Sequence, residues 1–303
     1  MGLREELILK NPENTCAKII NFIREKLHEF GKKGIVLGVS GGVDSALVAS
    51  FAKEAAGREK VLSLFMPERD TDPMSRKYAY LVADNLKISI KEINLTRVMR
   101  GIGVYRLEPS PLFFPRSIQE QYVFSKFRQF QDDKETTFLK FQKGGEENKE
   151  LMKAIAFLRI KHRLRMVMWY YEAELRNYLV LGCCNKTEKL TGYFIKYGDS
   201  AADIEPIAGL YKTQVRQLAC FSGVPQEIIE KAPTPDLMPG MTDEFALQFS
   251  YEDIDLVLFG LERGLPSEEI VKEARVTLKD LDYIKTLVEI SSHMRRMPSF
   301  PEL

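Results

Sequence analysis

A strand, a short loop of small residues and a helix follow one another early in the chain, and this unit constrains the fold more than any other stretch. The apolar run 35–39 predicts a buried strand, and the run 46–52 predicts the first turns of a helix. Glycines in the loop let backbone N–H groups approach a ligand, and the helix start adds partial positive charge. A plain strand-to-helix connection is the alternative, but the composition of the loop favours an anion-binding site.

The loop reads Ser-Gly-Gly-Val-Asp-Ser over residues 40–45. Ser40 and Ser45 add hydroxyl donors, and Asp44 is suited to hold a cation such as Mg²⁺. The common phosphate loop carries Lys and then Ser or Thr after its last glycine, whereas Val43 and Asp44 stand here. The difference disfavours transfer of a γ-phosphoryl group.

The strand-and-helix pattern continues after the loop. Strands are predicted at 61–65 and 89–95, and a helix at 73–86 begins with Asp72 as N-cap and Pro73 in its first turn. Such alternation predicts an α/β fold, a doubly wound parallel sheet flanked by helices, with ligands beyond the carboxyl ends of its strands. The chain is long enough for one large domain, and we expect a single domain over residues 1–303. Further helices are predicted at 12–30, 149–176 and 211–222, with a strand at 178–181 and two or three helices in the remainder, the last over 278–296.

An insertion at about residues 108–150 interrupts this pattern. Its aromatic residues alternate with basic ones, a mixture that also occurs in nucleic-acid-binding segments. Acidic residues outnumber the basic ones there by eight to seven, so we expect a lid, an oligomer contact or a small packing subdomain instead.

Overall composition excludes several classes of protein. Lys and Arg number 44 against 43 Asp and Glu, so no net charge recruits nucleic acid or a membrane surface. The four cysteines form no Cys-x-x-Cys pair, which argues against a zinc site and a disulfide scaffold. No apolar run is long enough for a membrane span, and the charged N-terminus lacks a secretory core. We therefore expect a cytoplasmic protein.

Four later stretches carry further candidate residues. On a helix Arg163 and Arg165 diverge by about 200°, so they cannot form one clamp, and at least one is expected at the surface. Glu188 follows a strand and is placed to face Asp44 across a metal ion, or else to interact with its own helix dipole. Lys212 lies at a helix start, against the dipole, which favours an anionic ligand.

These stretches, in this order, resemble the N-type ATP pyrophosphatases and, within them, the ammonia-dependent NAD⁺ synthetases. The resemblance rests on the loop at 40–45 and on six later motifs. They are Arg163-Leu164-Arg165-Met166, Asn185-Lys186-Thr187-Glu188, Gly192-Tyr193-Phe194, Lys196-Tyr197-Gly198-Asp199 and Leu210-Tyr211-Lys212-Thr213, followed by Pro233-Thr234. It implies an adenine nucleotide alpha hydrolase-like fold and ATP-dependent amidation of deamido-NAD⁺ by ammonia. The carboxylate is adenylated first, and AMP and pyrophosphate are released.

The resemblance also implies site residues. ATP is bound by Gly38, Val39, Ser40, Gly41, Gly42, Val43, Asp44, Ser45, Cys183, Lys212 and Thr234. Asp44 and Glu188 hold Mg²⁺, and Asp44 and Lys212 are the catalytic pair. Deamido-NAD⁺ is bound by Arg163, Lys196, Asp203 and His293. The resemblance also implies a homodimer. Because no glutaminase segment is visible, we expect the protein to use free ammonia or ammonia from a separate donor.

Four positions depart from the pattern of that family: Cys183 replaces a threonine, Ser200 and Ala201 replace two glycines, and Met294 replaces a lysine. For Asp199 and Asp203, the alternative to a role in the site is that they are solvent-exposed acidic residues of a turn. The departures keep three alternatives open. These are an adenylating ligase for another carboxylate, sulfur transfer to tRNA through Cys183 or Cys184, and a nucleotide-binding protein without activity.

Overall fold

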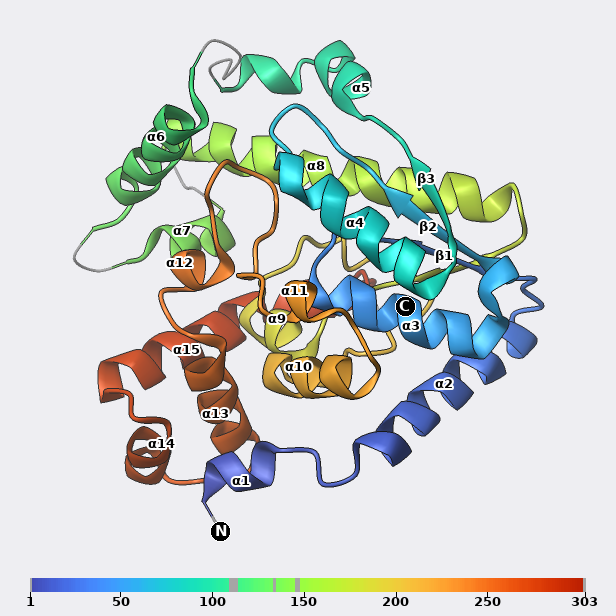
Figure 1. The fold of residues 1–303 in the computed structure, drawn as a ribbon. Helices are drawn as coiled ribbons and strands as arrows, with labels where there is room; N and C mark the ends of the chain where they lie inside the picture. Colours follow the sequence, from blue (N-terminus) through green and yellow to red (C-terminus); the bar gives the residue numbers. More distant parts are fainter. Residues whose placement is uncertain (1, 109–113, 133–134, 145–147, 302–303) are drawn as a thin grey trace.

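The computed structural model describes residues 2–108, 114–132, 135–144 and 148–301, and a parallel sheet lies at its centre (Figure 1). Its strands are β1 (Ile35–Gly38), β2 (Val61–Phe65), β3 (Ser89–Glu92) and β4 (Leu179–Leu181), in the order β3-β2-β1-β4. Ile35 pairs with Val61 on one side and with Leu179 on the other. The strand order reverses at β1, which confirms the predicted doubly wound sheet and puts the ligand-binding edge at the end of that strand.

Both faces of the sheet are covered by helices, as continuous apolar strands require. Leu37 belongs to the core shared with α2 (Pro12–Glu29), α3 (Val43–Ala56), α4 (Pro73–Leu86) and α10 (Lys212–Phe221). The next residue back, Val36, belongs to the opposite core, where Phe157 and Trp169 of α8 (Lys149–Glu174) pack. Figure 1 shows α3 and α4 in front of the sheet and α8 behind it. The sheet is therefore fixed from two sides.

The remaining helices extend the molecule beyond the sheet. They are α1 (Leu3–Leu7), α5 (Thr96–Gly101), α6 (Arg116–Gln129), α7 (Thr137–Lys143), α9 (Lys186–Thr191), α11 (Gln226–Ile229), α12 (Asp243–Leu247), α13 (Tyr251–Glu262), α14 (Ser267–Ala274) and α15 (Leu278–Ile290). Within the described residues, 3₁₀ turns lie at Arg58–Lys60, Val104–Arg106 and Ser291–Arg295. Helices α1, α13, α14 and α15 share a second apolar core. No helix of the described ranges is long and apolar enough to cross a membrane.

Most predicted elements agree with the structure, and the differences lie at their ends. The Asp72 side chain accepts the Met74 N–H at 2.8 Å, which confirms the predicted start of α4. Strand β3 ends at Glu92, three residues early, because it is an exposed edge strand with one neighbour. Residues 226–290 form five helices rather than two or three, since α11 and α12 span only four and five residues. The last helix gives way to a 3₁₀ turn at Ser291.

The described residues of the insertion include two helices, α6 and α7. Residues 109–113, 133–134 and 145–147 of the insertion lie outside the described ranges. Phe127 and Phe138 are buried, so these rings are not available to stack on bases. Basic residues of the insertion pair with acidic ones, as Lys140 does with Asp132 at 2.6 Å. Both observations disfavour nucleic-acid binding by the insertion.

Candidate active site

The loop at residues 38–45 leaves the carboxyl end of β1 and enters α3, as the sequence predicted. The Ser45 hydroxyl donates to the Gly42 carbonyl at 3.0 Å, and the Ser40 hydroxyl accepts the Gly42 N–H at 3.3 Å. Gly41 has a φ of +76°, and a Cβ there would lie 2.5 Å from Cβ of Tyr78. Both its conformation and its close neighbour therefore require glycine.

A cavity of about 320 Å³ opens above this loop. Among the residues predicted to bind ATP or metal, the lining includes Gly38, Val39, Ser40, Gly42, Val43, Asp44, Ser45, Cys183, Glu188, Lys212 and Thr234. Gly41 packs against Tyr78 and Ala79 of α4 instead. Residues from the whole length of the chain thus meet at the predicted edge of the sheet.

Lys212 joins the two carboxylates that the sequence assigned to metal. Its Nζ lies 2.5 Å from Oδ2 of Asp44 and 3.4 Å from Oε1 of Glu188. Burial alone lowers the pKa of Lys212, but the charges of Asp44 and Glu188 outweigh this effect and raise it. The ammonium therefore stays charged at neutral pH and is held at the phosphate-binding loop.

Asn185 places Glu188 at the start of α9. The Asn185 side chain accepts the Glu188 N–H, and the Glu188 carboxylate accepts the Asn185 N–H, forming a capping box. The amide of Asn185 also donates to Oδ1 of Asp44 at 2.9 Å. Asn185 thus positions both carboxylates, a role that was not among the predicted ones.

The site carries more negative than positive charge. Asp243, buried beside this group, accepts hydroxyl donations from Tyr193 at 3.1 Å and Tyr251 at 2.8 Å. Burial raises the pKa of Glu188 to about 8, and Asp44 and Asp243 add to the rise while Lys212 opposes it. Carboxylate oxygens with uncompensated charge suit a hard cation such as Mg²⁺. Within the described ranges no cluster of three or more His, Cys, Asp or Glu residues could hold a metal ion, so ligands beyond Asp44 and Glu188 would have to come from water or substrate.

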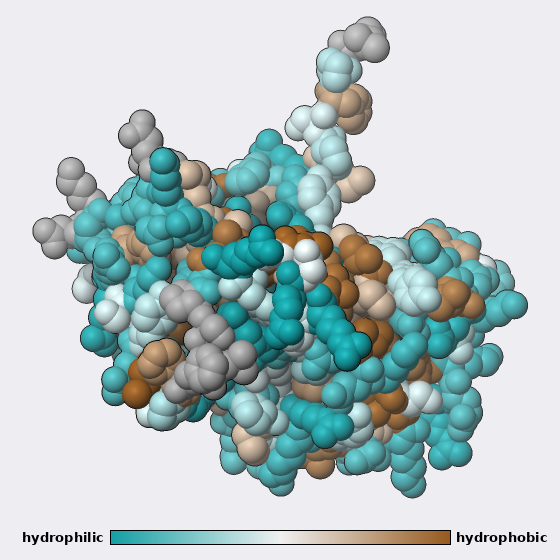
Figure 2. Space-filling model, turned by 90° about the horizontal axis from the view of Figure 1, so that it is seen from above, coloured by the Kyte–Doolittle hydropathy of each residue, from teal (hydrophilic) through white to brown (hydrophobic). Residues whose placement is uncertain are grey.

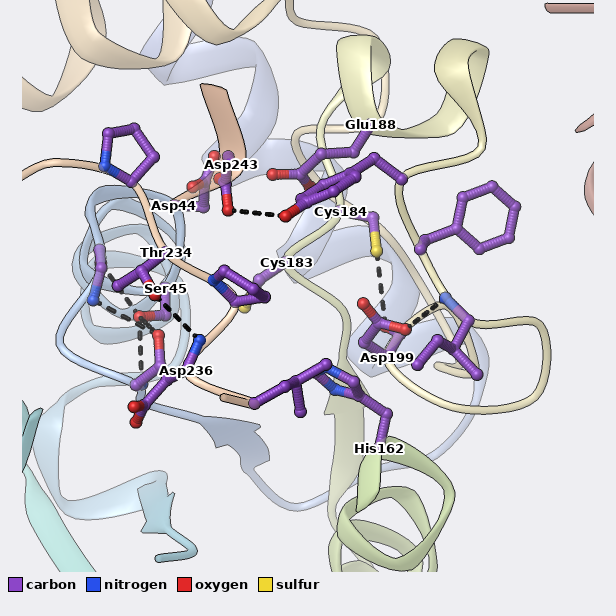
Figure 3. Close-up of a pocket in the computed structure, with 18 of the residues that line it drawn as sticks. Asp44, Ser45, His162, Cys183, Cys184, Glu188, Asp199, Thr234, Asp236 and Asp243 are labelled. Carbon is purple, nitrogen blue, oxygen red and sulfur yellow. Dashed lines mark hydrogen bonds between the residues drawn. The ribbon is translucent and has the colours of Figure 1, made fainter. Parts of the chain in front are cut away.

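One face of α8 forms the opposite wall of the cavity. It presents Ile155, Leu158, Arg159, His162, Arg165 and Trp169, which recur every three or four residues. Trp169 packs so closely on the loop that a Cβ at Gly38 would lie 2.8 Å from its ring. Figure 3 shows His162 and Asp199 facing the cavity across from Asp44 and Glu188. His162 was not among the predicted site residues, although it directly precedes Arg163 in the sequence.

Arg163 and Arg165 diverge, as predicted, and only Arg165 lines the cavity. The Arg165 Nε donates to the Met66 carbonyl at 3.3 Å. Arg163 instead donates to the Lys196 carbonyl at 3.4 Å, and the Lys196 ammonium donates to the His293 carbonyl at 3.1 Å. Both arginines are partly buried, so the expectation of a surface charge was wrong.

The four residues predicted to bind the dinucleotide lie outside the cavity. Arg163, Lys196 and His293 form one hydrogen-bonded group, whereas Asp203 lies elsewhere and is exposed. Its carboxylate accepts the N–H of Val180, the middle residue of the edge strand β4, at 2.8 Å. Their role in binding stays a prediction.

Asp199 differs from Asp203, although both were considered as solvated turn acids. Asp199 lines the cavity, and its carboxylate accepts the Ile195 N–H at 2.7 Å. Burial raises the pKa of Asp199 to about 6, while the backbone N–H groups and Arg165 oppose the rise. Asp199 is therefore part of the site, in contrast to the solvated alternative.

Comparisons with known proteins agree with this geometry. The NAD synthase family model matches residues 15–111 and 126–298. The NH(3)-dependent NAD(+) synthetase of Thermotoga maritima is 43% identical over 279 residues, covering 92% of this chain and 95% of the relative. That of Methanocaldococcus jannaschii is 37% identical over 291 residues, covering 96% and 97%. The chain belongs to the NAD synthase family.

Solved structures of this fold also match the chain over nearly its full length, at lower identity. The NMN synthetase of Francisella tularensis has a TM-score of 0.69 and 25% identity, covering 96% of this chain and 99% of that one. The NH3-dependent NAD synthetase of Campylobacter jejuni has a TM-score of 0.67 and 24% identity, covering 97% and 100%. The latter likeness supports the fold alone. The expected adenine nucleotide alpha hydrolase-like fold is thereby confirmed.

The departure at Cys183 falls inside the NAD synthase site. The Cys183 Sγ lies 3.9 Å from the Gly38 carbonyl oxygen, at the phosphate-binding loop. Burial raises the pKa of Cys183 and of its neighbour Cys184, and nearby carboxylates raise both further. A cysteine must ionise to accept and pass on sulfur, so these surroundings disfavour tRNA thiolation.

The insertion adds an aromatic wall to the NAD synthase cavity. Phe127 of α6 lines it together with Phe138, Phe141 and Gln142 of α7. The family model leaves residues 112–125 unmatched, which lie inside the insertion. Aromatic residues in sequence gave the signal for a buried element, but not its place beside the loop at 38–45.

Proposed function

We propose that this chain catalyses ATP-dependent amidation of deamido-NAD⁺ to NAD⁺ with ammonia, through an adenylated carboxylate, with release of AMP and pyrophosphate. The observation that carries the proposal is the convergence of the loop at 38–45 with Asp44, Glu188 and Lys212 on one cavity. Membership of the NAD synthase family supports the same activity.

In the first step the substrate carboxylate attacks the α-phosphorus of ATP and pyrophosphate leaves. This step needs charge neutralisation more than proton transfer. Under the proposal the loop N–H groups and the start of α3 hold the phosphates, and Lys212 offsets the charge of the leaving pyrophosphate. Cys183 and Thr234 lie in the cavity wall, where we propose that they contact the nucleotide.

Mg²⁺ fits the donor set described above, and Asp44 and Glu188 would hold it. The ion would supply charge to neutralise the phosphate oxygens. Lys212 occupies the space between these carboxylates in the structure, with its ammonium closer to Asp44 than to Glu188. We propose that Lys212 follows the phosphates when ATP binds and leaves the carboxylate oxygens free for the cation.

The dinucleotide is proposed to lie over the group of Arg163, Lys196 and His293 beside the cavity, with Asp203 at its far end. Arg163 and Lys196 are positively charged, which suits a pyrophosphate group. Only the pyridine carboxylate then has to enter the cavity. Such a division separates recognition of the dinucleotide from the chemistry on ATP.

We infer that the protein is a homodimer formed through α8. Val167, Tyr171 and Leu175 recur every four residues on the helix face opposite to the cavity and are 53%, 51% and 62% exposed. An apolar row of this length on an exposed helix suits a self-complementary contact. The four free cysteines support the predicted cytoplasmic location, since that compartment keeps thiols reduced.

An ATP–pyrophosphate exchange assay across carboxylates tests the function. Exchange with deamido-NAD⁺, followed by NAD⁺ formation on addition of ammonia, is the expected result. Activity with glutamine alone in the purified protein would contradict the use of free or separately donated ammonia. If no acid supports exchange, the result would favour the alternative of a nucleotide-binding protein without catalytic activity.

A ligase for another carboxylate is the second candidate. The similarity to the NMN synthetase structure favours this candidate, because that enzyme is named for a mononucleotide product. Exchange with the corresponding mononucleotide acid, and none with deamido-NAD⁺, would establish it. The adenylation chemistry proposed above would then remain, and only the assigned acid would change.

A further inference from the structure

Lys231 lines the cavity at the start of the segment that carries Thr234. Its Nζ lies 4.9 Å from the centre of the Tyr78 ring, on α4. Tyr78 is also the residue against which Gly41 packs. Figure 3 shows Thr234 on the Ser45 side of the cavity. The Lys231 ammonium therefore lies on the same side of the cavity as the phosphate-binding loop.

Within the described part of the chain, no carboxylate forms an ion pair with the Lys231 ammonium, and no oxygen accepts a hydrogen bond from it. Burial lowers the pKa of Lys231, and the more distant carboxylates of Asp236, Asp72 and Asp243 only oppose this fall. A partly buried cation of this kind has lost hydration that no protein group replaces. An anion that enters the cavity would supply the missing partner.

The other cationic residues of the cavity wall are engaged by the protein itself. Lys212 pairs with two carboxylates. Arg159 and Arg165 each donate to a backbone carbonyl, at 2.7 Å and 3.3 Å. These contacts hold the three side chains in place, whereas the flexible side chain of Lys231 is free to turn toward a ligand.

Lys231 and Lys212 approach the phosphate-binding loop from different elements. Lys212 begins α10, whereas Lys231 contacts α4 through Tyr78, and both helices pack against α3. A triphosphate bound at the start of α3 would be flanked by both ammonium groups. Most of its negative charge lies on the β- and γ-phosphates, so these groups gain most from a second lysine.

We propose that Lys231 binds the β- and γ-phosphates of ATP and holds the pyrophosphate as it leaves. The inference rests on the proposed function and adds a second lysine to its first step. In that step the substrate carboxylate oxygen forms a bond to the α-phosphorus, and the bond from this phosphorus to the oxygen that bridges to the β-phosphate breaks. The bonding electron pair goes to pyrophosphate, and no proton is transferred. The Lys231 ammonium offsets the charge that pyrophosphate gains.

Titration calorimetry on Lys231→Met tests this assignment, with ATP, inorganic pyrophosphate and AMP as separate ligands in the presence of Mg²⁺. ATP and pyrophosphate should each bind about 10- to 100-fold more weakly, because one charge-assisted hydrogen bond is lost. AMP lacks the β- and γ-phosphates, so its affinity should change by no more than about 2-fold. In ATP–pyrophosphate exchange the KM for pyrophosphate should rise by a similar factor. Lys231→Arg keeps the charge and should restore part of the affinity.

Lys77 provides the matched control. Its Nζ also lies over the Tyr78 ring, at 5.7 Å, but the residue is exposed and pairs with Glu227 outside the cavity. Lys77→Met should leave the binding of all three ligands unchanged. The comparison separates a direct contact with phosphate from an effect transmitted through Tyr78.

Unchanged pyrophosphate binding in Lys231→Met would overturn the proposal. An equal loss of AMP binding, in a variant whose urea unfolding is unaltered, would overturn it as well. Failure of the proposed function looks different, because the unaltered protein would then bind the three ligands but show no exchange with deamido-NAD⁺. The binding comparison needs no acid substrate, so it still decides the role of Lys231.

Discussion

Asp44 shows most directly how much of this site depends on single side chains. Its carboxylate contacts Lys212 on one oxygen and Asn185 on the other. Asp44→Asn keeps the size of the side chain but removes the charge that we assign to the cation. We expect pyrophosphate exchange to fall by at least about 100-fold.

Exchange rates at saturating ATP and Mg²⁺ check this prediction. Asp84→Asn, an exposed position on α4, serves as the matched control and should have no effect. Exchange retained by Asp44→Asn would rule out the proposed metal ligand.

Gly41 makes a second prediction at the scale of one residue. Gly41→Ala adds a Cβ 2.5 Å from the Tyr78 Cβ on a backbone with positive φ. We expect a loss of about 1–3 kcal/mol in the free energy of unfolding and a higher KM for ATP. Urea unfolding and exchange kinetics measure the two effects.

Gly57→Ala separates clash from backbone strain, because Gly57 also has positive φ but no heavy atom within 4 Å of its added Cβ. It should cost stability without changing the KM for ATP. If both variants change the KM equally, the contact with Tyr78 is not what shapes the loop.

Helix α13 positions the site, although none of its residues is a predicted site residue. Asp255 accepts the Thr187 hydroxyl at 2.5 Å and the Thr213 N–H at 2.8 Å. Thr187 and Thr213 adjoin Glu188 and Lys212, so one carboxylate aligns the starts of α9 and α10. The distance between Glu188 and Lys212 is therefore fixed by a third helix, α13, which contacts both α9 and α10.

Asp255 also predicts a pH dependence of stability. Burial raises the pKa of Asp255 to about 6, while hydrogen bonds from Thr187 and Thr213 oppose the rise. A raised pKa means that the folded state binds the proton more tightly than the unfolded state. The contribution to stability is therefore complete below the unfolded pKa and is lost as the pH rises through about 6.

Urea unfolding between pH 4 and 7 tests this dependence. Asp255→Asn should flatten the fall in the free energy of unfolding by up to about 3 kcal/mol over this range. Asp84→Asn should leave the pH profile unchanged. An identical profile for Asp255→Asn would show that Asp255 is not the titrating group.

Lys161 connects three elements around the cavity. Its buried ammonium lies 2.9 Å from Glu68 and 2.7 Å from Asp70, in the segment after β2, and donates to the Leu237 carbonyl at 2.7 Å. Lys161→Met leaves both carboxylates buried with less compensation, and we expect a loss of about 3–5 kcal/mol in the free energy of unfolding. Urea unfolding measures it, and a loss below about 1 kcal/mol would contradict this role.

At the scale of the whole molecule the proposed dimer makes α8 serve two functions. One face lines the cavity, and the other carries the exposed row of Val167, Tyr171 and Leu175. The chain after Arg296 also projects from the body, as Figure 2 shows, and Met297 and Phe300 on it are exposed. Both features support the surface behind the sheet as the proposed dimer interface.

Tyr171→Asp should shift the protein from dimer to monomer in light scattering coupled to size-exclusion chromatography. A buried charge facing its own symmetry copy costs enough to open a self-complementary interface. Phe22→Asp on α2 is the control, because Phe22 is exposed but lies on a helix at the other face of the sheet. A Tyr171→Asp protein that remains dimeric would exclude this face as the interface.

Local sequence determined much of this protein. The alternation of apolar strands with capped helices set the parallel sheet, and glycines with a following helix set the loop at 38–45, because both depend on neighbouring residues. The order of the motifs alone indicates the resemblance to the NAD⁺ synthetases. Each of these sequence patterns involves residues that are close to one another in the sequence.

Tertiary structure alone decided which side chains meet. Asp44 and Lys212 are 168 residues apart, and only the packing of α3 against α10 brings them together. Asp199 and Asp203 share one turn, yet one lines the cavity and the other is exposed. His162 and Arg165 face the cavity while Arg163 does not, because the docking of α8 on the sheet fixes its rotation. Sequence spacing shows which residues share a helix face, but the direction of that face depends on contacts with distant segments.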